Sequence, residues 1–262
     1  MRNLRLLIAY DGTDFHGWQR QPNLPTVQGR LEEAIGRIIG EPVNVHGAGR
    51  TDAGVHADGQ VANFQTSCRV PCGNLQKALN DALPPAIRIR RVHEVAKDFH
   101  SRYAARAKTY RYRICQQEVC PPFLWRFVLQ HPYPLDRARM AQAARLLKGE
   151  HDFTSFAAAD GTNEDELQKL GSRVRRIFQS DILLNRRLRL ILYEIRGDGF
   201  LHHMIRNIVG TLMEVGRGQL APEDISRILE ARDRSRAGPT APAQGLCLMR
   251  VEYEQDGQRA RP

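Results

Sequence analysis

The amino-acid sequence predicts an α+β fold built as two halves, and three of its features support this prediction. Of its 262 residues 42% are hydrophobic, enough to fill the core of one large domain or of two small ones. Patterns with the period of a helix alternate along the chain with patterns typical of strands. The order of elements in residues 1–104 also recurs, more loosely, in residues 105–262, without a sequence repeat at a fixed period. We therefore expect two domains with a boundary near residue 104.

The first half, residues 1–104, is expected to contain four strands and two helices. Its first helix has apolar residues at helical spacing behind Thr26, a residue type that caps helix N-termini. Its second helix stops at Pro84-Pro85, because proline cannot continue a helix. The resulting order, strand-helix-strand-strand-helix-strand, is that of a ferredoxin-like (split βαβ) unit. The expected elements are a strand at 4–10, a helix at 27–39, strands at 43–46 and 61–66, a helix at 75–83 and a strand at 87–95.

The second half, residues 105–262, is expected to begin with a strand at 108–115 in which Tyr110 and Tyr112 share one face. Asp136 can cap the helix that follows. The polar, acidic segment 157–171 lacks periodicity and is expected to be a mobile insertion, and the tail from Gln255 is expected to be disordered. The other expected elements are a helix from 136 to about 148, a hairpin of strands at 174–184 and 188–196, a helix at 201–216, a short helix after 222 and a strand at 246–254.

The chain has an excess of positive charge, with 39 Lys and Arg against 29 Asp and Glu and a formal net charge of +10. Such an excess attracts polyanions, which favours a nucleic acid as partner over an acidic small molecule or a membrane surface. An arginine-rich, GC-biased proteome would produce the same excess, so composition leaves both explanations open.

Neither secretion nor membrane insertion is predicted. The N-terminal apolar run is too short for a signal peptide, and no apolar stretch is long enough to span a bilayer. The five cysteines, an odd number, are typical of reduced thiols, so we expect a cytoplasmic protein. The pairs Cys68/Cys72 and Cys115/Cys120 have spacings that a zinc site can use, but neither lies in a Gly-rich knuckle, which favours ordinary packing.

The run Gly47–His56 is the strongest candidate for chemistry. Its glycines surround Arg50, Thr51 and Asp52 between two expected strands, and glycine lets the backbone expose side chains at a strand end. The alternative is a structural loop in which Asp52 caps its own backbone and pairs with Arg50. A dinucleotide-binding fingerprint is excluded, because its third glycine is missing and no helix opens at this point.

The segment Gly49-Arg-Thr-Asp-Ala-Gly-Val-His56 resembles the catalytic loop of the TruA family of tRNA pseudouridine synthases. The resemblance extends along nearly the whole chain, and six further motifs follow the family's order. The region 158–172 departs from it by being more acidic. The other motifs are Tyr10-Asp-Gly-Thr-x-Phe-x-Gly-Trp-Gln19, Phe99-His-x-Arg102, Lys108-Thr-Tyr-Arg-Tyr112, His151-Asp-Phe-Thr-Ser-Phe156 and Phe200-Leu-His-His-Met-Ile-Arg-Asn-Ile-Val-Gly210, with Ala243-Gln-Gly-Leu246 near the end.

The resemblance implies a pseudouridine synthase fold with a central, mostly antiparallel sheet and a basic cleft. It implies an isomerase that converts uridine to pseudouridine at positions 38, 39 and 40 of the tRNA anticodon arm, working as a homodimer. Asp52 would be the nucleophile, Tyr110 the aromatic against the target base, Arg206 the basic partner of the carboxylate, and Arg50 an RNA-facing residue.

These roles agree with the chemistry. Breaking the N1–C1′ bond, turning the base and joining C5 to C1′ can use an anionic carboxylate, without a metal, redox or nucleotide cofactor. A nearby arginine keeps that carboxylate ionised where burial opposes the charge. Tyr110 can also take a proton from the ribose. Because Asp52 lies in one half and Tyr110 and Arg206 in the other, we expect neither half to be active alone.

Each candidate also has a structural interpretation. A strand tyrosine such as Tyr110 is most often core. His202 and His203 are expected on the solvated face of a helix, where neighbouring side chains diverge by about 100 degrees, which disfavours a metal pair. Phe15 and Trp18 fit packing under their loop as well as contact with a base. Two other functions stay open: a non-catalytic RNA-binding or tRNA-folding module, and a related synthase acting on other uridines.

Overall fold

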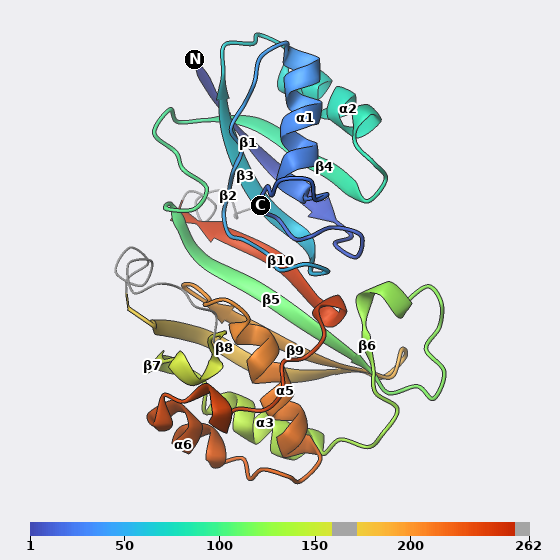
Figure 1. Ribbon diagram of the computed structural model, residues 1–262, viewed down its shortest axis with the longest axis vertical. Coiled ribbons are helices and arrows are strands. Elements are labelled where there is room, and N and C mark those ends of the chain that lie inside the picture. The colour runs from blue at the N-terminus through green and yellow to red at the C-terminus, as the bar shows by residue number, and fades with distance from the viewer. Residues whose placement is uncertain (159–171, 255–262) are drawn as a thin grey trace, which may run out of the picture. The chain divides into compact units, whose positions relative to one another are not determined.

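The computed structural model describes residues 1–158 and 172–254, and its fold is mixed α+β with mostly antiparallel strands (Figure 1). The chain divides into two compact units. The first comprises Met1–Lys108 together with the C-terminal strand from Cys247, and the second comprises Thr109–Leu246. The C-terminal strand, which sequence reasoning placed in the second half, is thus part of the first unit. Most of the insertion expected at 157–171, from residue 159 onward, and the tail from Gln255 lie outside the described residues.

The first unit is a sheet with two helices. Strand β1 pairs antiparallel with both β3 and β4, while β2 pairs antiparallel with β3. The C-terminal strand β10 joins the sheet in parallel, with Cys247 opposite His56 and Leu248 opposite Ala57. The elements are β1 (Arg2–Tyr10), α1 (Val27–Ile39), β2 (His46–Gly47), β3 (His56–Thr66), α2 (Cys72–Ala82), β4 (Ile87–Val95) and β10 (Leu246–Tyr253).

Local sequence explains most of these elements. The Thr26 hydroxyl accepts a hydrogen bond from the backbone N–H of Gly29 at 3.3 Å, so the predicted N-cap of α1 is confirmed. Leu4, Leu6 and Ile8 alternate along β1 and are almost fully buried, which forms the core face of that strand. The expected strand at 43–46 is wrong in its position: β2 contains only His46 and Gly47, because only these two residues pair with β3.

The second unit is built on a strand that crosses the boundary between the units in sequence. Its strands follow the order β5-β9-β8-β7, with β6 also paired to β5, and β8 and β9 form the predicted antiparallel hairpin. Tyr112 and Ile114 are completely buried, as the alternation in β5 predicts. The elements are β5 (Ala105–Cys115), β6 (Leu129–Gln130), α3 (Arg137–Arg145), β7 (Gly149–Asp152), β8 (Val174–Asn185), β9 (Leu190–Gly197), α5 (Met204–Gly216) and α6 (Asp224–Ala231).

Two helices of the second unit differ in extent from the prediction. The carboxylate of Asp136 accepts from the N–H groups of Ala138 and Arg139, so the predicted cap of α3 is confirmed, although the helix ends at Arg145. Helix α5 begins at Met204 and not at Leu201, because His203 has a left-handed backbone with φ of 57° that a right-handed helix cannot include. Over residues 1–158 and 172–254, no helix has the length and apolar character that a bilayer crossing requires.

Candidate active site

The loop that joins β2 to β3 carries Asp52, whose side chain is half-buried. Its neighbour Thr51 is buried and is held from two sides. The Thr51 hydroxyl hydrogen-bonds the Tyr10 hydroxyl at 2.8 Å, and the Thr51 carbonyl accepts from the backbone N–H of Trp18 at 3.0 Å. Burial raises the pKa of Tyr10 well above its usual range, so its hydroxyl stays neutral as a hydrogen-bond partner. The end of β1 and the loop after it therefore fix the backbone next to Asp52.

The same loop approaches the backbone of Gly12 on the other side of Asp52. A Cβ atom at Gly12 would lie 2.0 Å from the carbonyl oxygen of Val55, a distance that no side chain permits. The N–H of Gly12 donates to Nδ1 of the buried His56 at 3.0 Å, which fixes that ring. Sequence reasoning did not find these contacts of Gly12 and His56, although both residues belong to motifs that it quoted.

The aromatic residues of the loop after β1 pack inside the first unit. Phe15 is 8% exposed and Trp18 2%, and the Trp18 ring lies 6.2 Å from that of Tyr10. Of the two interpretations that the sequence left open, these contacts agree with packing under the loop.

Two basic side chains of the first unit lie at the Asp52 loop. Arg50 is exposed, and its Nε donates to the side-chain oxygen of Gln19 at 3.2 Å. The stem of Lys108 lies along Gly49, and its Nζ is 3.2 Å from the place where a Cβ of residue 49 would stand. Gly49 thus lies directly against Lys108, the first residue of the Lys108–Tyr112 motif.

In the second unit Tyr110 is buried at 6% exposure, and its ring meets Phe200 edge to face at 5.2 Å. This environment also fits the core tyrosine of the structural interpretation, so a role against a base stays a prediction. Tyr112, two residues on, donates from its hydroxyl to the carbonyl of Pro242 at 2.7 Å. Burial raises the pKa of Tyr112 far above its usual range.

Arg206, in the first turn of α5, is tied to the segment that leads to β10. Its Nε donates to the carbonyl of Ala241 at 2.8 Å, and the N–H of Ala241 donates back to the carbonyl of Arg206 at 3.1 Å. The next residue, Asn207, is completely buried; it donates to the Phe156 carbonyl at 2.8 Å and accepts from the Thr240 hydroxyl at 2.6 Å. These bonds fix the guanidinium of Arg206 on the surface of its helix.

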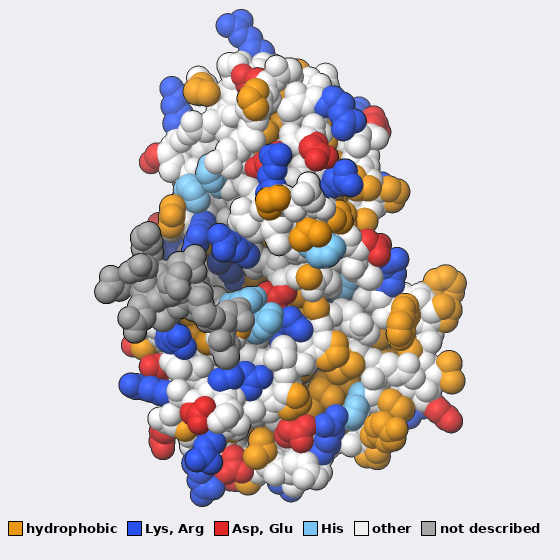
Figure 2. Space-filling model, in the orientation of Figure 1, with side chains coloured by type: hydrophobic (Ala, Val, Ile, Leu, Met, Phe, Trp, Pro, Cys, Tyr) orange, Lys and Arg blue, Asp and Glu red, His pale blue; other side chains and the backbone are white. Residues whose placement is uncertain are grey.

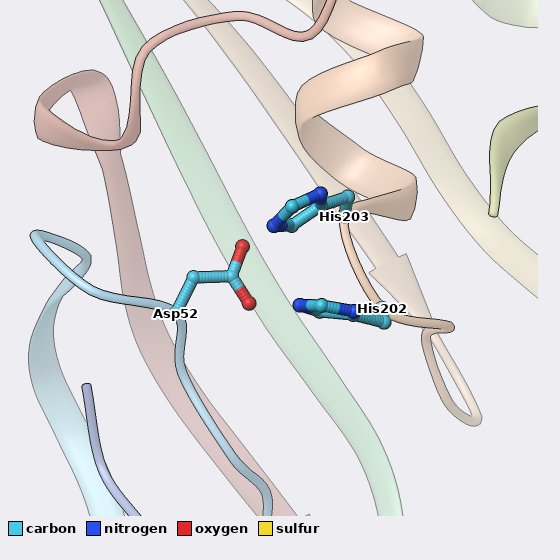
Figure 3. Close-up of side chains that lie close together, drawn as sticks. All are labelled: Asp52, His202 and His203. Atoms are coloured by element: carbon cyan, nitrogen blue, oxygen red, sulfur yellow. The ribbon is translucent and has the colours of Figure 1, made fainter. Parts of the chain in front are cut away.

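His202 and His203 directly precede α5, and their rings are 4.0 Å apart at 41° (Figure 3). Their expected position on a helix is wrong, so the argument that their side chains diverge does not apply. Figure 3 also shows Asp52 on its own loop.

The cysteines pack as thiols. Cys115 is fully buried with Val128 and Leu190, and Cys120 packs against this group. Arg2 donates to the carbonyl of Cys68 at 3.2 Å and to the sulfur of Cys72 at 3.4 Å, which ties this segment to β1. None of the five cysteines forms a disulfide.

Several arginines that contribute to the positive charge have acidic partners. Arg90 pairs with Asp58 at 2.8 Å, and Arg111 pairs with Glu194 at 2.6 Å, while Arg106 pairs with Glu254. Figure 2 nevertheless shows more Lys and Arg than Asp and Glu side chains on the visible face, in agreement with the net charge of +10. A large part of the positive charge is therefore at the surface.

Comparison with known proteins gives extensive similarity. The model of a family described as tRNA pseudouridine synthase matches residues 6–104 and 143–254. A protein of Solibacter usitatus named tRNA pseudouridine synthase A is 53% identical over 253 residues, covering 97% of this chain and 100% of that protein. A protein of the same name from Brevibacillus brevis is 45% identical over 254 residues, covering 97% of this chain and all of its own length. One from Moorella thermoacetica is 47% identical over 256 residues, covering 95% and 99%.

Proposed function

The chain belongs to the tRNA pseudouridine synthase family, and from this premise we propose that it modifies the anticodon arm of tRNA with Asp52 as its nucleophile. It is an isomerase that converts uridine to pseudouridine in tRNA. One observation supports the role of Asp52 above the others. The half-buried Asp52 stands between Thr51, held by Tyr10 and Trp18, and Val55, whose N–H donates to the Asp52 carbonyl at 3.1 Å. Because this backbone is constrained, the carboxylate is held in position to approach the ribose in one orientation.

We assign Tyr110, Arg206 and Arg50 to the same uridine. Tyr110 presents its ring to the flipped base, Arg206 favours the ionised form of the carboxylate, and Arg50 contacts the RNA backbone. The fixed guanidinium of Arg206 and the exposed side chain of Arg50 support these roles. The first unit, which contains residues 1–104, carries the nucleophile, and the second unit, Thr109–Leu246, carries Tyr110 and Arg206.

The reaction rearranges bonds within one nucleotide. A uridine in a stem-loop must first leave the base stack. The N1–C1′ bond then breaks while the Asp52 carboxylate attacks C1′ or orients a proton loss from the ribose, in which Tyr110 is the base. The uracil turns and C5 bonds to C1′. In the first route the Asp52–C1′ bond breaks at this step and its electron pair returns to the carboxylate, whereas in the second route the ribose regains its proton from Tyr110. N1 then takes up a proton, and the proton on C5 leaves to solvent. Atoms and electrons balance without a metal or a redox partner.

The proposal includes the wider arrangement. The order β1-α1-β2-β3-α2-β4, with β1 between β3 and β4, supports a ferredoxin-like first unit. The net charge of +10 supports a basic cleft for the RNA. A homodimer in the cytoplasm, working on positions 38, 39 and 40, completes the proposal, and sedimentation analysis of the purified protein tests the dimer.

Release of tritium tests the function directly. Unmodified tRNA with tritium at uridine C5 should lose it to water when incubated with the protein, because bond formation at C5 expels that atom. Asp52→Asn should abolish release while RNA affinity stays within about twofold. Asp58→Asn, an exposed aspartate of β3, is the matched control and should remain active. No release from any tRNA would favour the non-catalytic RNA-binding module.

The modified positions require a second measurement. Chemical labelling of pseudouridine followed by primer extension should give stops at positions 38, 39 and 40 only. Stops elsewhere in tRNA, or in other RNA, would instead identify a related synthase with different targets. RNA binding should also weaken steeply with salt, since phosphate contacts release counterions.

A further inference from the structure

Three rings and one guanidinium of the first unit form a surface stack, which we call the His46 stack and define as His46, His100, Arg102 and Tyr103. The His46 and His100 rings are 5.0 Å apart, and the His100 and Tyr103 rings 4.4 Å apart at 35°. The Arg102 guanidinium lies 6.0 Å from the centre of the Tyr103 ring. Tyr103 is 78% exposed, so the stack ends at an aromatic side chain that opens to solvent.

The backbone under the stack is rigidly held. The hydroxyl of the fully buried Ser101 donates to the carbonyl of His46 at 2.5 Å, and the N–H of Ser101 donates to the Asn63 side chain at 2.9 Å. Tyr253 donates to the Ser101 carbonyl at 2.7 Å. The N–H of Arg102 donates to Nδ1 of His100 at 3.1 Å, which orients that ring. The backbone that carries these side chains is therefore fixed before any partner binds.

The core of the first unit does not explain the outer part of this stack. Tyr103 adds little to the buried surface, because most of its ring is in water. A stiff ring beside a cation is what proteins present to unpaired bases, which stack on aromatic faces and on guanidinium planes. Partial burial, followed by the charges of His46 and Arg102, lowers the pKa of His100, so its ring stacks in the neutral form near pH 7.

The chain places this stack close to the proposed nucleophile. His46 opens β2, and Asp52 follows it by six residues in the same unit, a span of about 20 Å at most. One RNA stem-loop can therefore meet both positions. We propose that the His46 stack binds an unpaired base of the substrate RNA, outside the uridine that reacts, and this inference rests on the proposed function.

Binding in the Asp52→Asn background separates this inference from catalysis. The probe is the unmodified anticodon stem-loop RNA, measured by filter binding at fixed salt. Tyr103→Ala should weaken binding about 5- to 150-fold, the range expected for one lost base stack. Tyr103→Phe should bind within about twofold, because it keeps the ring. Tyr133→Ala is the matched control, since Tyr133 is also exposed, at 70%, beside a histidine, His131, but in the second unit.

The nature of the contact is tested with 2-aminopurine substituted in turn for each unpaired base. At one position the fluorescence of 2-aminopurine should fall when the RNA binds a protein that retains Tyr103. It should not fall when the RNA binds the Tyr103→Ala variant. Arg102→Ala should reduce the slope of log affinity against log salt, whereas Tyr103→Ala should leave that slope unchanged. Equal affinities of Tyr103→Ala and Tyr133→Ala would overturn the inference. The inference would also be overturned if Tyr103→Ala weakened binding to a fully paired RNA duplex as much as it weakens binding to the stem-loop. If no tritium were released but Tyr103→Ala still bound the RNA more weakly than Tyr133→Ala, only the catalytic proposal would be overturned.

Discussion

Lys108 lies against Gly49 so closely that a Cβ at position 49 would be 3.2 Å from its Nζ and 3.5 Å from its Cε. The contact joins the start of the Lys108–Tyr112 motif to the loop that carries Asp52. A side chain at position 49 would therefore displace the end of the Lys108 side chain.

Gly49→Ala should push the Lys108 ammonium away by a few tenths of an ångström. Because displacements of this size at a site are costly, we expect kcat for tritium release to fall roughly threefold to tenfold. Lys108→Met, which removes the charge, should be at least as severe. Gly73→Ala is the control, since nothing lies within 4 Å of a Cβ there, and it should leave kcat unchanged. Full activity of Gly49→Ala would show that the position of Lys108 has no role.

Gly12→Ala should disturb the Asp52 loop from its other side. Its Cβ would be 2.0 Å from the Val55 carbonyl oxygen, and backbone cannot move aside as a flexible side chain can. We expect a loss of about 1–3 kcal/mol in the free energy of unfolding. Tritium release should fall further than RNA affinity, because the loop and not the RNA surface is displaced. Urea unfolding measures the loss of stability, and tritium release is compared with RNA affinity measured by filter binding. Equal losses of tritium release and RNA affinity would contradict this explanation.

Much of the fold follows from local patterns. The periodicity and the threonine cap of residues 27–39 predict α1 within its observed bounds, and the alternation at 87–95 predicts β4. Two failures have tertiary causes. Strand β2 has two residues because its extent depends on pairing with β3, and α5 starts late because His203 adopts a left-handed backbone. Neither cause has a signal in the local sequence.

The sequence likewise predicts only a part of the candidate site. The Gly-rich run and the family motifs identify Asp52, but they do not reveal what supports it. Gly12 and Val55, and Gly49 and Lys108, are pairs whose members lie 43 and 59 residues apart in the chain, and only the folded chain joins them. The ambiguity of Trp18 has the same origin, because burial of an aromatic loop residue depends on which strands surround it. The motifs predict which residues matter, and the structure supplies the contacts.

Asn207→Ala should weaken the second unit near Arg206. The buried amide donates to Phe156 and accepts from Thr240, so its removal leaves polar groups without partners inside the protein. We expect a cost of about 1–3 kcal/mol in the free energy of unfolding. Because Thr240 precedes Ala241, which accepts from Arg206, kcat should fall as well. Thr240→Val should give a smaller loss of stability, and unchanged stability of Asn207→Ala in urea would contradict the role of this network.

The stability of the first unit should depend on pH through Glu41. The Thr66 hydroxyl, then the N–H and hydroxyl of Ser67, donate to its carboxylate, and these bonds lower the pKa of Glu41 in the folded protein. A group whose folded pKa lies below its unfolded value stabilises the fold above the unfolded pKa, about 4.3 for glutamate. That stabilisation fades as the pH falls through the lower, folded pKa.

Glu41→Gln should therefore lower Tm at pH 7, and the difference from the unchanged protein should shrink as the pH falls below about 4. Differential scanning calorimetry from pH 3 to pH 7 measures both curves. Glu33→Gln, on the exposed side of α1, is the control and should change Tm little, because surface ion pairs contribute little to stability. A Tm difference for Glu41→Gln that is the same at pH 3 and pH 7 would show that the effect comes from packing. The bonds from Thr66 and Ser67 to an ionised carboxylate predict a Tm difference that is smaller at pH 3 than at pH 7. The reason is that protonation removes the charge that those donors stabilise.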